Sequence, residues 1–102
     1  MAQKVNINEA TELINSGEKV IIDFFATWCG PCQMLLPIYD EISIELHDVK
    51  MVKIDIDEEP DFASNNGITS VPTIVAFKNG KEVSRVSGFR NKEDLISFIK
   101  GI

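Results

Sequence analysis

The sequence predicts an α/β fold, with helices on both faces of a central mixed sheet of four to five strands. Residues 19–26, KVIIDFFA, form a nearly continuous apolar run that suits a strand buried on both faces. Across residues 31–47 the apolar side chains recur instead at helical spacing: Leu35, Ile38, Ile42 and Leu46. Within 73–87, Asn79-Gly80 joins two strand-like runs, as in a hairpin.

The first half of the chain alternates strands and helices. Residues 2–6 can form a short first strand. We expect Asn8 to cap a first helix over about 9–16, because its side chain can accept a hydrogen bond from a free backbone N–H. Gly17 can end that helix. The buried strand at 19–26 then leads into the helix at 31–47.

The second half completes the sheet. Residues 49–56 alternate apolar and polar side chains, which predicts a second long strand. A short helix is expected at 60–65, ended near Gly67, and the hairpin at 73–87 follows it. Asn91 can cap a last helix through a weak capping box with Asp94. The 102 residues are expected to form one domain, 1–102.

Charge and hydropathy disfavour several partners. The net charge is −6 with acidic residues spread along the chain, whereas nucleic-acid binding requires clustered Lys and Arg. The longest apolar run is far too short to cross a membrane. The first ten residues show no signal-peptide pattern, so we expect a cytoplasmic location, where disulfides tend to be transient and catalytic.

Both cysteines, Cys29 and Cys32, flank the pair Gly30-Pro31, and three interpretations are open. A structural staple across so short a loop contributes only about 2 kcal/mol, against about 3 kcal/mol for fifteen residues. A structural zinc site requires four Cys or His ligands, and the only histidine, His47, lies far along the next helix. Such a site is expected only if two copies of the chain share the metal. The third interpretation is a redox pair.

The redox interpretation has a physical basis. Cys29 lies where the buried strand meets the helix, so its sulfur faces free backbone N–H groups and the positive end of the helix dipole. These features stabilise the thiolate, which is the nucleophile. Pro31 fits a first helical turn, where an N–H would be unpaired, and Cys32 faces inward one turn along. A C-x-x-C pair placed after a buried strand favours redox chemistry.

Four motifs carry a family resemblance that runs over essentially the whole chain: WCGPC, its extension DFFATWCGPC, VPT at 71–73 and FKNGK at 77–81. They closely resemble the thioredoxins. The resemblance implies a thioredoxin fold and a general protein dithiol–disulfide oxidoreductase, in which Cys29 attacks a client disulfide and Cys32 resolves the mixed disulfide. It also implies recycling by a flavin-dependent thioredoxin reductase with electrons from NADPH.

Asp23 lies within the buried strand, where a carboxylate is costly unless it is paired or protonated. One interpretation is a structural ion pair with Lys53 of the neighbouring strand. The other is a carboxyl with a raised pKa that exchanges a proton with Cys32, which is the role that the resemblance implies. We favour the second, with Lys53 tuning Asp23, since buried titratable groups beside a nucleophile are poor choices for stability alone.

The resemblance implies that further residues contact clients or shape their docking. Trp28 is expected to be an exposed indole beside the thiol. Pro72 is expected to be cis and to face the disulfide, which leaves the backbone of Val71 free to pair with an extended client segment. Gly88 is expected to allow close approach of a partner. The predicted client-binding set is Trp28, Gly30, Pro31, Val71, Pro72 and Gly88.

Two residues depart from the family pattern. Phe25 stands where many thioredoxins carry a second tryptophan, and Gln33 where many carry Lys or Arg. The second departure removes a positive charge from the edge of the site, which can change partner preference. Met34 and Tyr39 are assigned to packing, and His47 to the solvated surface.

We expect no bound cofactor, because the chain has no phosphate loop or flavin motif. The expected partners are a thioredoxin reductase and disulfide-containing clients such as ribonucleotide reductase, peroxiredoxins and methionine sulfoxide reductases, with the chain itself a monomer. An oxidising or isomerising relative is a rival hypothesis, disfavoured by Gly-Pro between the cysteines. A binding subunit with incidental redox chemistry is a second rival, which serine at both cysteines distinguishes.

Overall fold

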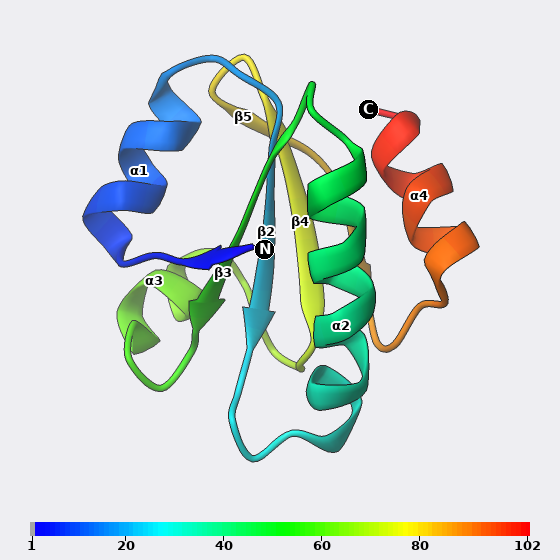
Figure 1. The fold of residues 1–102 in the computed structure, drawn as a ribbon. Coiled ribbons are helices and arrows are strands. Elements are labelled where there is room, and N and C mark those ends of the chain that lie inside the picture. The colour runs from blue at the N-terminus through cyan, green and yellow to red at the C-terminus, as the bar shows by residue number, and fades with distance from the viewer. Residues whose placement is uncertain (1) are drawn as a thin grey trace.

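A computed structural model describes residues 2–102, which fold around a five-stranded mixed sheet of strand order β1-β3-β2-β4-β5 (Figure 1). The parallel part comprises β1 (Gln3–Lys4), β3 (Lys50–Asp55) and β2 (Val20–Phe25). The other two strands form the hairpin: β4 (Thr73–Lys78) runs antiparallel to β2, and β5 (Lys81–Ser87) antiparallel to β4. The predicted fold class is confirmed.

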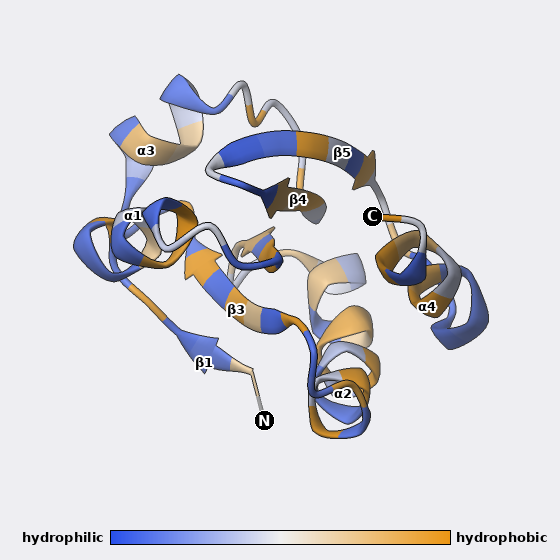
Figure 2. Ribbon diagram, turned by 90° about the horizontal axis from the view of Figure 1, so that it is seen from above, coloured by the Kyte–Doolittle hydropathy of each residue, from blue (hydrophilic) through white to orange (hydrophobic). Residues whose placement is uncertain are grey.

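Helices cover both faces of the sheet. Helices α1 (Ile7–Asn15) and α3 (Pro60–Asn65) lie on one face, and α2 (Gly30–Glu45) and α4 (Lys92–Lys100) on the other (Figures 1 and 2). Strand β2 supplies both cores because successive side chains point to opposite faces. The core under α2 and α4 includes Ile21, Leu35, Tyr39, Ile42, Ile74 and Leu95; the core under α1 and α3 includes Val20, Ile22, Phe24, Ile54 and Val75.

The first helix begins earlier than predicted. Its N-cap is Asn6, so the assignment of Asn8 is wrong. The Asn6 side chain accepts from the Glu9 N–H at 2.9 Å, and Glu9 in turn accepts from the Asn6 N–H at 3.0 Å. This reciprocal capping box satisfies two donors at once, whereas Asn8 has Thr11 three residues on and cannot close one. Gly17 follows the helix with φ +82°, as predicted for its end.

The remaining boundaries lie close to those predicted. Helix α3 occupies the predicted residues 60–65. In the hairpin turn Asn79 has φ +56° and Gly80 φ +80°, which are the left-handed values that a type I′ turn requires. The Asn91 side chain accepts from the Asp94 N–H at 2.9 Å and caps α4. Within residues 2–102, no helix has the length and apolarity needed to cross a membrane.

Candidate active site

The two cysteines lie where β2 meets α2. Cys29 is the N-cap of α2, with an extended backbone, and its sulfur accepts the Cys32 N–H at 3.2 Å. The two sulfur atoms are at disulfide-bonding distance, with Cα atoms 5.2 Å apart. The first turn of α2 carries no acidic side chain, so no negative charge of that turn opposes the positive end of the helix dipole near Cys29. This arrangement favours thiolate formation when the pair is reduced.

The two cysteines differ in access. Cys32 is fully buried, while Cys29 keeps 6% of its surface exposed. Both pack with Phe25 and Ala26 in a small apolar cluster, against which Ile56 and Val71 pack. The Cys29 sulfur lies 3.6 Å from the carbonyl oxygen of Val71. A partner sulfur therefore has a path to Cys29 and not to Cys32.

The segment before β4 lies against the disulfide. The Val71–Pro72 peptide bond is cis. The N–H of Gly88, which has φ +86°, donates to the Pro72 carbonyl at 2.8 Å, so the start of β4 is tied to the end of β5. An added Cβ at Gly88 has no heavy atom within 4 Å, which leaves open space beside this glycine. Gly30 and Pro31 form the first turn of α2 between the cysteines.

Trp28 is exposed beside the cysteines, with 68% of its surface accessible. Its indole N–H donates to the Asp57 carboxylate at 2.8 Å, which holds the ring at the rim. A groove of about 300 Å³ runs from this ring to Val71, lined by Trp28, Ile56, Ile68, Thr69, Ser70 and Val71. The contact with Asp57 was not expected, because nothing in the sequence pairs two residues 29 positions apart.

Asp23 is fully buried on β2, and within residues 2–102 neither carboxylate oxygen has a hydrogen-bond partner. Burial raises the pKa of Asp23 to about 7; the charge of Lys53 lowers it and that of Asp40 raises it further. Asp23 shares a sheet face with Phe25, two residues on, and Phe25 packs against the cysteines. A buried carboxyl that titrates near neutral pH thus lies on the cysteine side of the sheet.

The ion pair between Asp23 and Lys53 is not formed. The two residues are partners in the parallel register of β2 and β3. The Lys53 ammonium group instead lies over the Phe25 ring, 5.8 Å from its centroid. Lys53 therefore acts on Asp23 through its charge rather than through a direct contact.

Other predictions for helix α2 are partly corrected. Tyr39 is fully buried, as expected, and its hydroxyl lies 3.0 Å from the Ile21 carbonyl oxygen and 2.7 Å from that of Val52. Met34 does not pack in the core: 62% of its surface is exposed, because the neighbouring Leu35 occupies the inward face of the helix. Gln33, at the edge of the site, donates from its amide to the Thr27 carbonyl at 3.3 Å.

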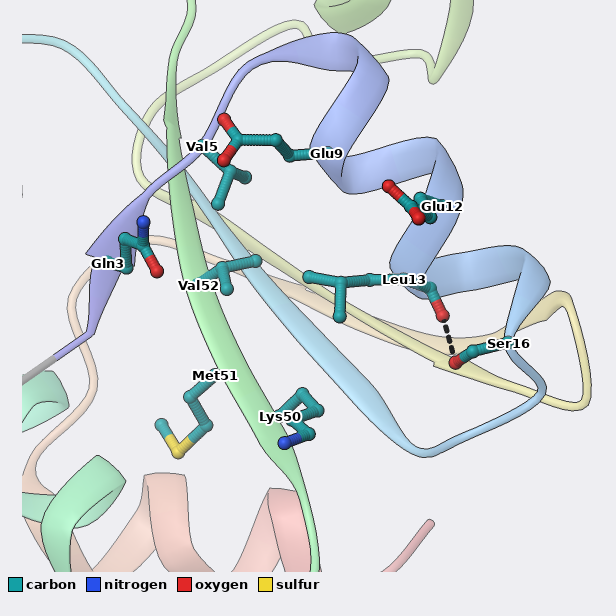
Figure 3. A pocket seen from close by; sticks show the side chains of 9 residues that line it. All are labelled: Gln3, Val5, Glu9, Glu12, Leu13, Ser16, Lys50, Met51 and Val52. Carbon is teal, nitrogen blue, oxygen red and sulfur yellow. Dashed lines mark hydrogen bonds between the residues drawn. The ribbon is translucent and has the colours of Figure 1, made fainter.

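A second hollow, of about 530 Å³, lies between α1, β1 and β3 (Figure 3). Val5, Leu13 and Val52 form its apolar side, and Glu9 and Glu12 its acidic rim. None of the predicted site residues lines it. Among residues 2–102, no group of three or more His, Cys, Asp or Glu side chains is placed to hold a metal ion.

Comparison with known proteins agrees with this geometry. The thioredoxin family model matches residues 2–101. A thioredoxin from Rickettsia typhi is 47% identical over 95 residues, covering 92% of this chain and 90% of the relative. Mitochondrial thioredoxin 3 from Saccharomyces cerevisiae, in its oxidised form, superposes with a TM-score of 0.89 at 38% identity, covering 99% of this chain and 95% of the yeast chain.

A further neighbour comes from a structure on the thiol resolving mechanism in yeast mitochondrial 1-Cys peroxiredoxin via glutathione/thioredoxin systems. It has a TM-score of 0.89 and 37% identity, and covers 99% of this chain and 95% of that one. The matched family, the shared fold and the bonded cysteine pair make this chain a dithiol–disulfide oxidoreductase. It belongs to the thioredoxin family.

Proposed function

We propose that this chain reduces disulfides of client proteins with Cys29 as attacker and Cys32 as resolver, and that a thioredoxin reductase restores its dithiol. One observation carries the division of roles: Cys29 caps α2 beside the Val71 backbone and keeps 6% of its surface exposed, while Cys32 is fully buried. An attacking thiol must reach the client, whereas a resolving thiol needs to reach only its neighbour.

The exchange proceeds in two steps. The Cys29 thiolate attacks one sulfur of the client disulfide; the client S–S bond breaks, a mixed disulfide forms and one client thiolate leaves. Cys32 then loses its proton, and its thiolate attacks the Cys29 sulfur. The mixed disulfide breaks, the Cys29–Cys32 disulfide forms and the second client thiolate leaves. The client gains two electrons, and this chain is oxidised by two.

Asp23 is the base that accepts the Cys32 proton, directly or through water. A pKa of about 7 suits this role, because both protonation states are then populated near neutral pH. Lys53 tunes that pKa by its charge. The support is the position of Asp23 on the cysteine side of β2 and the absence of hydrogen-bond partners for its carboxylate among residues 2–102.

The client docks along the groove between Trp28 and Val71. The exposed indole supplies a rigid apolar surface of the kind enriched at protein interfaces. The Val71 backbone lies beside the reactive sulfur, where an extended client segment can pair with it. Pro72 and Gly88 hold this segment in place, and Gly30 and Pro31 shape the turn between the sulfurs.

The partners and location follow from this chemistry as proposals. The clients include ribonucleotide reductase, peroxiredoxins and methionine sulfoxide reductases; the yeast neighbour solved in a peroxiredoxin context supports the second class. The chain works as a monomer in the cytoplasm, where a reducing pool suits a catalytic disulfide. It needs no cofactor of its own, since the flavin belongs to the reductase.

Insulin reduction coupled to NADPH oxidation by a bacterial thioredoxin reductase tests this function. We expect NADPH consumption that depends on the chain and is abolished when both cysteines are replaced by serine. A chain that leaves the insulin disulfides intact, although the reductase reduces its own Cys29–Cys32 pair, contradicts the proposed function. A binding subunit keeps its partner affinity in the double-serine variant, so partner binding without insulin reduction would favour that rival.

A further inference from the structure

We propose that Arg85, on β5, is a positioning residue for client binding: it fixes the segment that carries Val71 in front of Cys29. This inference rests on the proposed client-docking role of the groove between Trp28 and Val71. The hydrogen bonds of Arg85 reach neither the cysteines nor the side chains that line the groove. It acts on the backbone that leads into them.

The Arg85 guanidinium is held on both sides. Its Nε donates to one Glu82 carboxylate oxygen at 2.7 Å and its Nη2 to the other at 2.6 Å. On the far side Nη2 donates to the Asn66 carbonyl at 2.7 Å and Nη1 to the Gly67 carbonyl at 3.4 Å. The two-oxygen contact with Glu82 sets the plane of the guanidinium group, so its remaining donors point at a defined place.

That place is the end of helix α3. The last carbonyls of a helix have no partner within the helix, and a cation near them is favourable. Gly67, with φ +70°, follows the C-cap Asn66, and the Ile68 N–H returns to the Ala63 carbonyl at 3.0 Å. The Asn66 side chain also donates to the Phe62 carbonyl at 2.8 Å, and Arg85 adds contacts to the two carbonyls that directly follow α3, those of Asn66 and Gly67.

The segment 68–71 runs directly from this point to the disulfide. Ile68 and Val71 line the docking groove, and the Val71 carbonyl oxygen lies 3.6 Å from the Cys29 sulfur. Its far end is anchored through the hydroxyl of Thr73, which donates to the Ser70 carbonyl at 2.7 Å. The contacts of Arg85 with the Asn66 and Gly67 carbonyls hold the other end, so segment 68–71 is fixed on both sides.

A purely structural role for Arg85 would instead predict that its loss lowers the stability of the fold. Its side chain is 33% exposed and that of Glu82 36%, and ion pairs this exposed contribute little to the stability of the fold. Loss of Arg85 should therefore leave the chain folded and the chemistry of the cysteines intact. The effect should fall on the binding of large clients, which need the whole groove wall.

The test compares Arg85→Gln with Lys92→Gln. Lys92 is a matched control, because its side chain is 34% exposed and ion-paired with Glu41 and Glu45, away from segment 68–71. For each variant, KM and kcat are measured for insulin, and a second-order rate for 5,5′-dithiobis(2-nitrobenzoate), a small disulfide that needs no groove. For Arg85→Gln we expect a KM for insulin raised roughly threefold to tenfold, with kcat and the small-disulfide rate unchanged.

Several results overturn the inference. An unchanged KM for insulin overturns it. A small-disulfide rate that falls by the same factor as kcat/KM for insulin also overturns it, because the effect would then lie on the cysteines. If Arg85→Gln does not fold, Glu82→Gln keeps the arginine but frees its guanidinium. Hydrogen exchange of the Ile68 amide, which donates to the Ala63 carbonyl at 3.0 Å, must then speed up in that variant, and unchanged protection overturns the inference. Wild-type chain that fails to reduce insulin contradicts the proposed function instead.

Discussion

Lys53 lies opposite Asp23 across the parallel strands β3 and β2, yet its ammonium group rests over the Phe25 ring and makes no salt bridge to that carboxylate within residues 2–102. Asp23 is therefore a buried acid that no direct contact stabilises in its charged form. Burial is the largest cause of its raised pKa of about 7. Both the stability and the chemistry of the chain should depend on this one group.

Asp23→Asn should make stability less dependent on pH. The unfolded Asp23 ionises near 3.8 and the folded one near 7, so between these values the folded state binds more protons and stability falls as pH rises. The span of about 3 pH units corresponds to roughly 4 kcal/mol. We expect the free energy of unfolding of the variant, relative to wild type, to increase by about that much from pH 4 to pH 8. Urea unfolding at both pH values measures it, and parallel pH curves would show that Asp23 does not titrate as described.

Lys53→Met should move the pH profile of the resolving step upward. The charge of Lys53 lowers the pKa of Asp23, so its removal raises that pKa, and the base becomes active only at higher pH. The measurement is the rate of Cys32 attack on a preformed mixed disulfide across pH 5 to 9. Lys50→Met, at the exposed start of the same strand, is the control and should leave the midpoint in place. A Lys53→Met profile that coincides with wild type, or moves downward, removes Lys53 from the account.

Pro31→His should make the protein more oxidising. Pro31 adds no charge in the first turn of α2, whereas His places a potential cation and hydrogen-bond donor beside the Cys29 thiolate. Only the dithiol state carries that anion, so the dithiol is stabilised relative to the disulfide. About 1.4 kcal/mol of preference corresponds to about 30 mV, and we expect a rise of tens of millivolts. Equilibration against glutathione, read from Trp28 fluorescence, gives the potential; an unmoved or lower value in a folded variant rules out control by this dipeptide.

Trp28→Ala should weaken client binding with little loss of stability, because 68% of the residue is exposed. The variant removes one wall of the docking groove, and an exposed aromatic anchor of this kind typically contributes more than about 1 kcal/mol, which corresponds to at least about fivefold in KM. Met34→Ala is the control, since Met34 is 62% exposed on α2 but does not line the groove. If the two variants have equal KM values for insulin, Trp28 has no docking role.

The elements with strong local signals could be predicted from the sequence. The apolar run of β2, the Asn79-Gly80 turn and the short helix α3 each depend on neighbours in the chain. The start of α1 also had a local signal, the capping box from Asn6 to Glu9, which the prediction of Asn8 overlooked. Met34 shows the limit of helical periodicity: Met34 and Leu35 are adjacent apolar residues, and only packing decides that Leu35 is the one that enters the core.

The parts of the site that depend on long-range geometry could not be predicted in this way. The bond from Trp28 to Asp57 joins a loop to the segment after another strand, and Arg85 reaches the end of α3 from β5. Lys53 was correctly placed beside Asp23 by strand register, but register does not determine where a flexible side chain ends. Roles of this kind arise from tertiary packing, which residue type alone does not encode.

The measurement that tests the central claim most directly is trapping of a mixed disulfide with an oxidised client, followed by mass spectrometry. Cys32→Ser should accumulate a covalent adduct through Cys29, because the attack proceeds and the resolving thiol is missing. Cys29→Ser should form no adduct and show no turnover, because Cys32 is fully buried. If both variants trap the client equally, or if only Cys29→Ser does, the assignment of Cys29 as attacker and Cys32 as resolver is wrong.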